Sequence, residues 1–343
     1  MVDVTIRGAG IFGLSIAWAC TLRGAKVQVI DPNGPGAGSS GGLVGALAPH
    51  VPENWNAKKA FQLESLLMAE RFWSDVKDAS NMETGYVRSG RIQPITDARA
   101  LSLARRRGDS AKVLWQDRAI WAVVPTSDAR WTVPSPSDWI IRDSLSALLH
   151  PRKSVQALAR ALKNVECEVK TDGVDRGPVV WATGLHGLEI LNAGHHRQVG
   201  NGIKGQAALL KYDAAERPQL FVDGLHIIPH LDGTVAIGST SEREYSSATG
   251  TDGQLDALIA EARALLPALQ DAEVIEKWAG IRPRARSRAP MLGPWPGRPG
   301  HFVANGGFKI GFGMAPKVAE VMAELVLEGR NVIPEGFDVK ASY

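Results

Sequence analysis

Cysteine is scarce in this sequence, and so is an excess of charge of either sign. Cys20 and Cys167 are the only cysteines among 343 residues, which excludes a disulfide scaffold and a zinc site built from cysteines. The 39 lysines and arginines against 36 aspartates and glutamates give a formal net charge of +3. Bulk charge therefore does not demand nucleic acid or an anionic membrane as a partner.

Long apolar runs, internal repeats and low-complexity tracts are also missing. No stretch approaches the roughly 18 apolar residues of a transmembrane helix, so we expect no membrane partner. The strand-like run Val2 to Ile6 follows Met1 directly and leaves no room for a signal peptide, so we expect a cytoplasmic protein. The chain is long enough for about two domains of roughly 150 residues each.

The first 31 residues carry the patterns of a strand, a tight turn, a helix and a second strand. Alternating apolar residues over 2–6 lead into G-A-G-I-F-G at Gly8 to Gly13, and the apolar stretch 14–22 predicts a helix. A second strand pattern over 27–30 ends at Asp31. This order is typical of the βαβ unit that holds the ADP half of a dinucleotide.

Each glycine of this unit has a physical role. Gly8 permits the turn, Gly10 lets the backbone approach a pyrophosphate, and Gly13 allows close packing of helix and strand. The helix N-terminus presents free N–H groups to the phosphates. Asp31, 18 positions after Gly13, is placed to accept hydrogen bonds from ribose hydroxyls. These features fit NAD and FAD equally, because both cofactors use this cradle.

Three further segments favour FAD over NAD. The loop of small residues from Gly36 to Pro49 replaces the helix expected in a nicotinamide-binding domain, and it suits close approach of backbone N–H groups to a phosphate and a flat ring. A second glycine-rich loop, residues 305–316, runs into a predicted helix over 317–327. Residues 179–184 predict a buried parallel strand that ends in a tight turn.

With these segments in order, the sequence resembles the D-amino acid oxidase (DAO) family of FAD-dependent oxidoreductases, especially its glycine oxidase-like branch. The resemblance covers nearly the whole chain. The matching stretches are Gly8–Gly13, Ser39–Pro49, Ala182–Gly184, Gly205-Gln206, Ile228–His230, Gly233, Ile237-Gly238, Ala279–Pro283, Pro290–Pro294 and the loop 305–316.

The resemblance implies an α/β fold with two domains. A discontinuous Rossmann-like FAD-binding domain would comprise residues 1–50, 140–195 and 290–343. A substrate domain with a mixed, mostly antiparallel sheet would comprise residues 51–139 and 196–289. The sequence agrees, because short strand patterns at 220–222, 225–228 and 235–237 surround Asp232-Gly233.

The resemblance also assigns candidate catalytic residues. Arg282 would grip a substrate carboxylate with its planar fork, since Ala279-Gly280-Ile281 before it resemble the end of a buried strand. Lys309 would lie near the flavin N1 and C2 carbonyl and favour the reduced, anionic flavin. His50, directly after the small-residue loop, would line the active site. For each of these residues a role outside catalysis is the alternative: Arg282 would be a surface arginine in a salt bridge, Lys309 a solvated lysine, and His50 a residue that only packs or forms hydrogen bonds.

FAD would be bound non-covalently, because neither cysteine lies near the C-terminal loop at which related sarcosine oxidases attach their flavin. The expected cofactor-binding residues are Gly8, Gly10, Ile11, Phe12, Gly13, Asp31, Pro32, Ser39, Ser40, Gly45, Ala46, Leu47, Ala182, Thr183, Gly184, Arg282, Gly307, Phe308, Lys309, Ile310 and Gly311. We expect no metal site: His195 and His196 are adjacent, and no third ligand lies at suitable spacing.

The sequence departs from the family pattern at two places. A β-meander of some 20–30 residues is absent before the strand ending at Gly184, because only residues 170–178 separate it from a strand pattern at 165–169. After Arg282-Pro283 the chain continues Arg284-Ala285-Arg286-Ser287-Arg288. In an extended segment these arginines would share a face, and Arg284 would meet a second anionic group on the substrate. If the chain turns at Pro283, all three are solvated.

The leading hypothesis is an enzyme that oxidises the C–N bond of a small amino acid or secondary amine by hydride transfer to flavin N5, giving an imine that hydrolyses. Oxygen or another acceptor would reoxidise the flavin. An alternative is a 2-hydroxy acid oxidase or dehydrogenase, which the same clamp would serve, and another is a tRNA-modifying oxidase module. The triplet Arg105-Arg106-Arg107 indicates a solvated helix face, so nucleic acid is not an expected partner.

Overall fold

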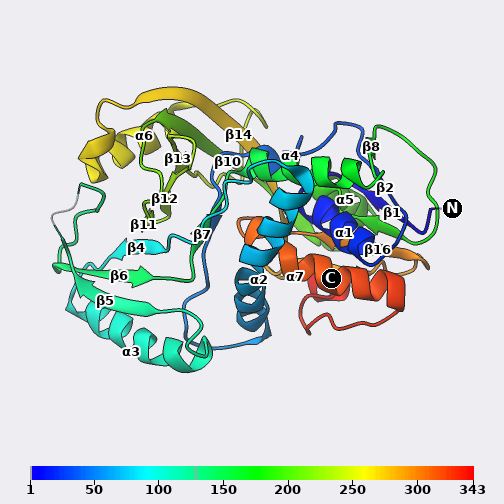
Figure 1. Cartoon of the computed structure of the whole chain (residues 1–343), viewed down its shortest axis with the longest axis horizontal. Coiled ribbons are helices and arrows are strands. Elements are labelled where there is room, and N and C mark those ends of the chain that lie inside the picture. Colours follow the sequence, from blue (N-terminus) through cyan, green and yellow to red (C-terminus); the bar gives the residue numbers. More distant parts are fainter. Residues whose placement is uncertain (1, 128–129) are drawn as a thin grey trace.

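Two sheets, with helices packed on them, organise the chain (Figure 1). The computed structural model describes residues 2–127 and 130–343. The first sheet has the strand order β15-β16-β9-β1-β2-β8 and the second β14-β10-β13-β12-β11-β4-β6-β5. A short antiparallel pair, β3 (Ala46–Leu47) and β7 (Ala147–Leu148), lies apart from both.

The first sheet is parallel except at its edge. Its strands are β1 (Val4–Arg7), β2 (Val27–Ile30), β8 (Val169–Lys170), β9 (Val179–Trp181), β15 (Met291–Pro294) and β16 (His301–Asn305). Only the β15–β16 pair is antiparallel among the pairs within the described ranges. The central strands are short and mostly buried, as is usual for a parallel sheet covered on both faces.

Four helices beside this sheet share one hydrophobic core, and a fifth packs in a separate cluster. The four are α1 (Ile11–Leu22), α2 (Ala57–Ser80), α4 (Pro151–Asn164) and α7 (Gly311–Glu328). The fifth is α5 (Gly184–Ala193). Helix α1 packs against α4 and α7, and α2 packs against the same two helices. The predicted βαβ unit is confirmed, although α1 begins at Ile11, within the glycine motif. Helix α7 likewise begins at Gly311 rather than at the predicted Lys317.

The second sheet is mixed and mostly antiparallel, as predicted. Its strands are β4 (Arg91–Pro94), β5 (Trp121–Pro125), β6 (Trp139–Asp143), β10 (Gly200–Lys211), β11 (Gln219–Val222), β12 (Leu225–Pro229), β13 (Thr234–Gly238) and β14 (Glu273–Ala285). Only β4 and β11 pair in parallel among the described strands. Helices α3 (Ala98–Leu114) and α6 (Gly253–Leu265) and the 3₁₀ turns Ser39–Gly41, Pro267–Leu269 and Val339–Ser342 complete the fold.

Two elements pack with a different domain from the one that the predicted ranges assign to them. Helix α2 lies within 51–139, predicted for the substrate domain, but packs on α4 and α7 beside the parallel sheet. Strand β6 extends beyond residue 139 into the range predicted for the FAD-binding domain, but it belongs to the second sheet. The division into domains therefore stays a prediction.

The missing meander is confirmed, because residues 171–178 between β8 and β9 contain no strand. The prediction that a strand begins at Val165 was wrong. Helix α4 runs to Asn164, Val165 caps it, and β8 begins only at Val169. Within the described ranges, no helix combines the length and apolarity needed to span a membrane.

Candidate active site

A cavity of about 780 Å³ is lined by residues from both sheets and from the loops that leave them. This volume is in the range of small-molecule and cofactor sites. Every residue predicted to bind the cofactor lines this cavity except Gly13. Segments more than 270 residues apart in the chain therefore converge at this cavity.

Gly8 and Gly13 pack the start of α1 against the parallel sheet. Gly8 has φ +103°, and a Cβ at this position would overlap the carbonyl of Ala182 at the end of β9. A Cβ at Gly13 would overlap the carbonyl of Gly8. Gly13 thus has the packing role expected of the third glycine and does not line the cavity.

The N-termini of two helices are exposed to the cavity. Gly10 and Ile11 at the start of α1 line it, and so does Gly311 at the start of α7. The N–H of Ile11 donates to the Ser40 hydroxyl at 2.9 Å, which ties the small-residue loop to the same end of α1. Helix N-termini carry partial positive charge and favour phosphate, so this end of the cavity suits an anion.

Asp31 is held rigidly at the end of β2. One carboxylate oxygen accepts from the N–H of Ala9 at 2.7 Å, and the other accepts from Asn33 at 2.9 Å. The side chain lines the cavity beside the glycine turn. A fixed acceptor here has the position expected for binding ribose hydroxyls.

The residues present fit an FAD molecule. The hydroxyl oxygen of Thr183 is buried without a hydrogen-bond partner in the described part of the chain, and Thr183 lines the cavity. A Cβ at Gly307 would lie 2.9 Å from the Phe12 ring, so the second glycine-rich loop passes the cavity with no room for a side chain. An orphaned donor and a backbone-lined wall are what a dinucleotide site provides.

Arg282 reaches the cavity from β14. It is 8% exposed, and its Nη1 donates to the carbonyl of Thr240 at 3.3 Å. A Cβ at Gly205, on the neighbouring strand β10, would overlap its guanidinium. Burial lowers the pKa of Arg282 to about 10, and the charge of Glu242 opposes this shift. Arg282 therefore remains charged at neutral pH as a buried cation available to a carboxylate.

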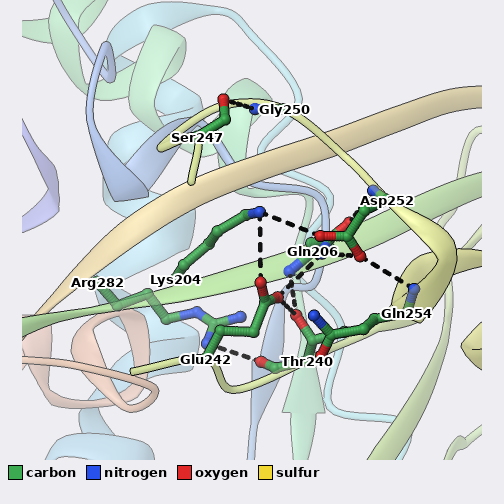
Figure 2. A network of polar contacts seen from close by, with 9 residues as sticks. All are labelled: Lys204, Gln206, Thr240, Glu242, Ser247, Gly250, Asp252, Gln254 and Arg282. Atoms are coloured by element: carbon green, nitrogen blue, oxygen red, sulfur yellow. Dashed lines mark hydrogen bonds and ion pairs between the residues drawn. The ribbon is translucent and has the colours of Figure 1, made fainter. Parts of the chain in front are cut away.

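A polar network behind Arg282 holds Glu242 in place (Figure 2). The ammonium of Lys204, 2% exposed, lies 3.3 Å from Glu242 and 3.6 Å from Asp252. The Gln206 amide donates to both carboxylates, at 3.0 and 2.9 Å. Burial opposes ionisation of Glu242, but hydrogen bonds from Thr240, Gln206 and Lys204 outweigh it and hold its pKa below the usual value. The network therefore keeps Glu242 ionised, which places one negative charge near the guanidinium of Arg282.

Lys309 and His226 face the same part of the cavity as Arg282. Burial, with a contribution from Arg282, lowers the pKa of Lys309 to about 8. Burial and the positive charges of Arg91, Lys309 and Arg282 lower the pKa of His226 to about 3. The His226 ring is therefore neutral at physiological pH. Its Nδ1 is buried without a hydrogen-bond partner in the described part of the chain.

Comparison with known proteins agrees with this geometry. The family model "DAO: FAD dependent oxidoreductase" matches residues 3–325. The chain belongs to this family. A glycine oxidase of Pseudomonas aeruginosa is 27% identical over 96% of this chain and 96% of its own length. The bifunctional protein ThiO/ThiG of Trichormus variabilis is 25% identical over 96% of this chain, which spans about half (53%) of that relative.

Solved structures support the fold of this DAO family member. The glycine oxidase of Geobacillus kaustophilus superimposes with a TM-score of 0.84 at 20% identity, covering 98% of each chain. The iminodiacetate oxidase of Chelativorans sp. BNC1 gives the same TM-score at 21% identity and the same coverage. The fold and the cavity of this α/β chain thus agree with its membership of the family of FAD-dependent oxidoreductases.

His50 is not brought to the cavity of this DAO family member. Its backbone N–H donates to Gln62 Oε1 at 2.7 Å, and its ring Nδ1 contacts the same oxygen. Burial lowers the pKa of His50. Gln62, on α2, lines the cavity in its place. The catalytic role of His50 stays a prediction.

Sequence reasoning missed His226, Trp278 and Gln62, all of which line the cavity. His226 and Trp278 lie on strands β12 and β14, and only the pairing of the second sheet brings them to this wall. In the described part of the chain, no three His, Cys, Asp or Glu side chains are grouped to bind a metal. The His195 ring packs on Tyr343, with centroids 3.8 Å apart.

Proposed function

We propose that this FAD-dependent enzyme oxidises the C–N bond of a small α-amino acid or of an N-substituted relative of one, giving an imine that hydrolyses. The observation that carries the proposal is the buried guanidinium of Arg282, which faces the cavity that the two glycine-rich loops also line. FAD, when bound, supplies the hydride acceptor. Glycine oxidase relatives of full length support an amine rather than an alcohol as substrate.

The chain's own residues bind and orient the substrate. Arg282 binds the carboxylate with two parallel N–H groups and so fixes the rotation of the small molecule. Lys309 would add positive charge to the cavity and so favour the reduced, anionic form of a bound flavin. The neutral ring of His226 offers a hydrogen bond without adding a third positive charge. The Trp278 indole lines the same cavity and keeps water from this wall.

The experiment is anaerobic bleaching of the bound flavin by a matched pair of substrate panels. One panel holds glycine, sarcosine, proline and both alanine enantiomers, and the other holds glycolate and both lactate enantiomers, the 2-hydroxy counterparts of glycine and alanine. Bleaching by amines alone supports the proposal. Bleaching by hydroxy acids alone favours the second candidate, a 2-hydroxy acid oxidase or dehydrogenase, which the same clamp would serve. Rapid reoxidation by air distinguishes an oxidase from a dehydrogenase.

We expect the flavin to be released by acid, because FAD would be held without a covalent bond. Cys20 in α1 and Cys167 before β8 do not line the cavity, and burial raises the pKa of their thiols to about 12 and about 11. Unionised, buried thiols are poor nucleophiles. Precipitation with trichloroacetic acid should leave all yellow colour in the supernatant. Flavin that stays with the pellet would contradict this prediction.

Binding of carboxylates is expected to weaken as the pH rises through about 8. Lys309 is charged below its pKa of about 8 and neutral above it, so the cavity loses one of its cations in this interval. A cation several Å from the carboxylate contributes roughly three- to tenfold in affinity at moderate ionic strength. Titration of the holoenzyme with acetate, followed by the flavin spectrum between pH 6.5 and 9.5, measures the change. Lys309→Met should abolish this step, and an unchanged step in that variant would contradict the assignment.

A further inference from the structure

The arginines that follow Arg282 do not extend the substrate clamp. Strand β14 continues through Pro283 to Ala285, so the chain does not turn at the proline, which lies on the edge strand of the sheet. Arg284 shares the face of Arg282 but does not line the large cavity. The chain turns only after Ala285, where the N–H of Arg288 donates to the Ala285 carbonyl at 3.0 Å.

These arginines gather instead around a second hollow of about 500 Å³. Arg197, which precedes β10, joins them there from a distant part of the sequence. The lining residues are Arg197, Gln198, Gly200, Asn201, Arg284, Ala285, Arg286 and Arg288. The residues that line the hollow thus include four arginines, one glutamine, one asparagine and no acidic residue.

The hollow carries more positive than negative charge. Within the described ranges, none of its four arginines has an Asp or Glu carboxylate within 4.0 Å, whereas Arg107, Arg152 and Arg91 each pair with one. Arg286 donates one N–H, at 3.1 Å, to an oxygen of Tyr343, the last residue of the sequence. The Lys58 ammonium, which bonds the Arg288 carbonyl, brings a further cation, and burial together with Arg288 and Arg284 lowers its pKa. A bound anion would reduce the mutual repulsion of these groups.

The hollow adjoins the large cavity. The guanidinium carbon of Arg284 lies 5.4 Å from the centroid of the Phe308 ring, and Phe308 lines that cavity next to Lys309. The N–H of Phe308 also donates to the Pro283 carbonyl at 3.0 Å, which ties the backbone of this loop to β14. Phe308 therefore lies next to residues of both sites.

We propose that this hollow is a binding site for a compact phosphoryl anion of at least two charges, such as a pyrophosphate group on a small molecule. Guanidinium forks match phosphate oxygens in geometry, and several forks around one concave site favour a multiply charged anion. An extended polynucleotide would need a track of free cations. The other arginine cluster does not form one, because Arg107 pairs with Glu53 and Arg105 lies over the Trp139 ring, which leaves Arg106 alone without such a partner in the described part of the chain.

The test is calorimetric titration of the FAD-loaded enzyme with sodium pyrophosphate, so that the dinucleotide cradle is already filled. We expect saturable binding of one anion per chain. The double variant Arg197→Gln/Arg286→Gln should weaken binding at least about tenfold, because it removes two charged forks. Both side chains are exposed, so neither change disturbs the core; Arg284 is left in place because it packs on Phe308.

A matched control removes the same charge elsewhere. Arg99→Gln/Arg160→Gln changes two exposed arginines on α3 and α4 that line neither cavity, and it should leave the pyrophosphate affinity within about twofold. Absence of saturable binding, or equal weakening in both double variants, overturns the proposal. Binding of a short RNA with no binding of pyrophosphate also overturns it, in favour of a polynucleotide. The readout is binding, so it is independent of whether the proposed amine oxidation is correct.

Discussion

Replacement of Arg282 by alanine is expected to lower kcat/KM for a carboxylate-bearing amine about 30- to 4,000-fold. Loss of one partner of a buried, hydrogen-bonded charge pair costs about 2–5 kcal/mol, at about 1.4 kcal/mol per factor of ten. Arg282 is the buried guanidinium of the large cavity, and the nearby carbonyl of Thr240 satisfies only one of its N–H groups. The remaining donors are therefore available to the substrate.

The FAD content should not change in the Arg282→Ala enzyme, because the glycine turns and helix N-termini that form the cradle lie elsewhere. Steady-state kinetics with glycine and sarcosine, together with the flavin absorbance of the purified protein, measure both quantities. Arg286→Ala, an exposed arginine that does not line the large cavity, is the control and should retain its kcat/KM. An Arg282→Ala enzyme with unchanged kcat/KM would mean that another group binds the carboxylate.

Replacement of Lys204 by methionine is expected to destabilise the protein by about 3–5 kcal/mol. Removing one member of a buried ion pair leaves the other charge without compensation, and this penalty is larger than the net benefit of the intact pair. Lys204 lies on β10 between Glu242 and Asp252, and its side chain is almost fully buried. Methionine has a similar length and keeps the apolar part of the packing.

Combining Lys204→Met with Glu242→Gln should recover part of the lost stability, because the buried carboxylate is then removed together with its ammonium partner, while Arg282 loses the negative charge beside it. Equilibrium denaturation of the three variants and the parent, at equal FAD saturation, provides the comparison. A double variant as unstable as Lys204→Met alone would show that the lysine contributes through packing rather than charge. Lys277→Met, which removes an exposed partner of Asp256, controls for the loss of a surface ion pair and should cost little.

The cofactor cradle could be predicted from sequence because its determinants are local. Gly8, Gly10 and Asp31 act within one strand–turn–helix–strand unit, and their spacing alone specifies the turn, the helix start and the acid. The second glycine-rich loop was recognised for the same reason. Only the first residues of α1 and α7 were misplaced in this cradle. Glycine has a low helix propensity, so glycines in the first turn of a helix make that turn resemble a loop in the sequence.

The substrate wall could not be predicted in the same way, because long-range strand pairing creates it. Lys204 and Arg282 are neighbours only through the β10–β14 ladder, in which Ile203 lies opposite Arg282. His226 reaches the cavity through the order of β12, β13 and β10 in the second sheet. No spacing along the chain encodes these contacts. The loop position of His50 suggested a catalytic residue, but the side chain turns to Gln62 on α2, a helix that the sequence had placed in the other domain.

The space above Gly205 has a consequence for engineering the enzyme. Because a methyl group at residue 205 would occupy the volume of the Arg282 guanidinium, the two positions share one compartment. In a library that randomises residue 205 alone, we expect most variants to retain bound FAD and to lose turnover. Changing the two positions together, with a larger side chain at 205 and a shorter one at 282, moves the recognition group from one strand to its neighbour. The pair is therefore the natural unit for redirecting this scaffold toward amines that lack a carboxylate.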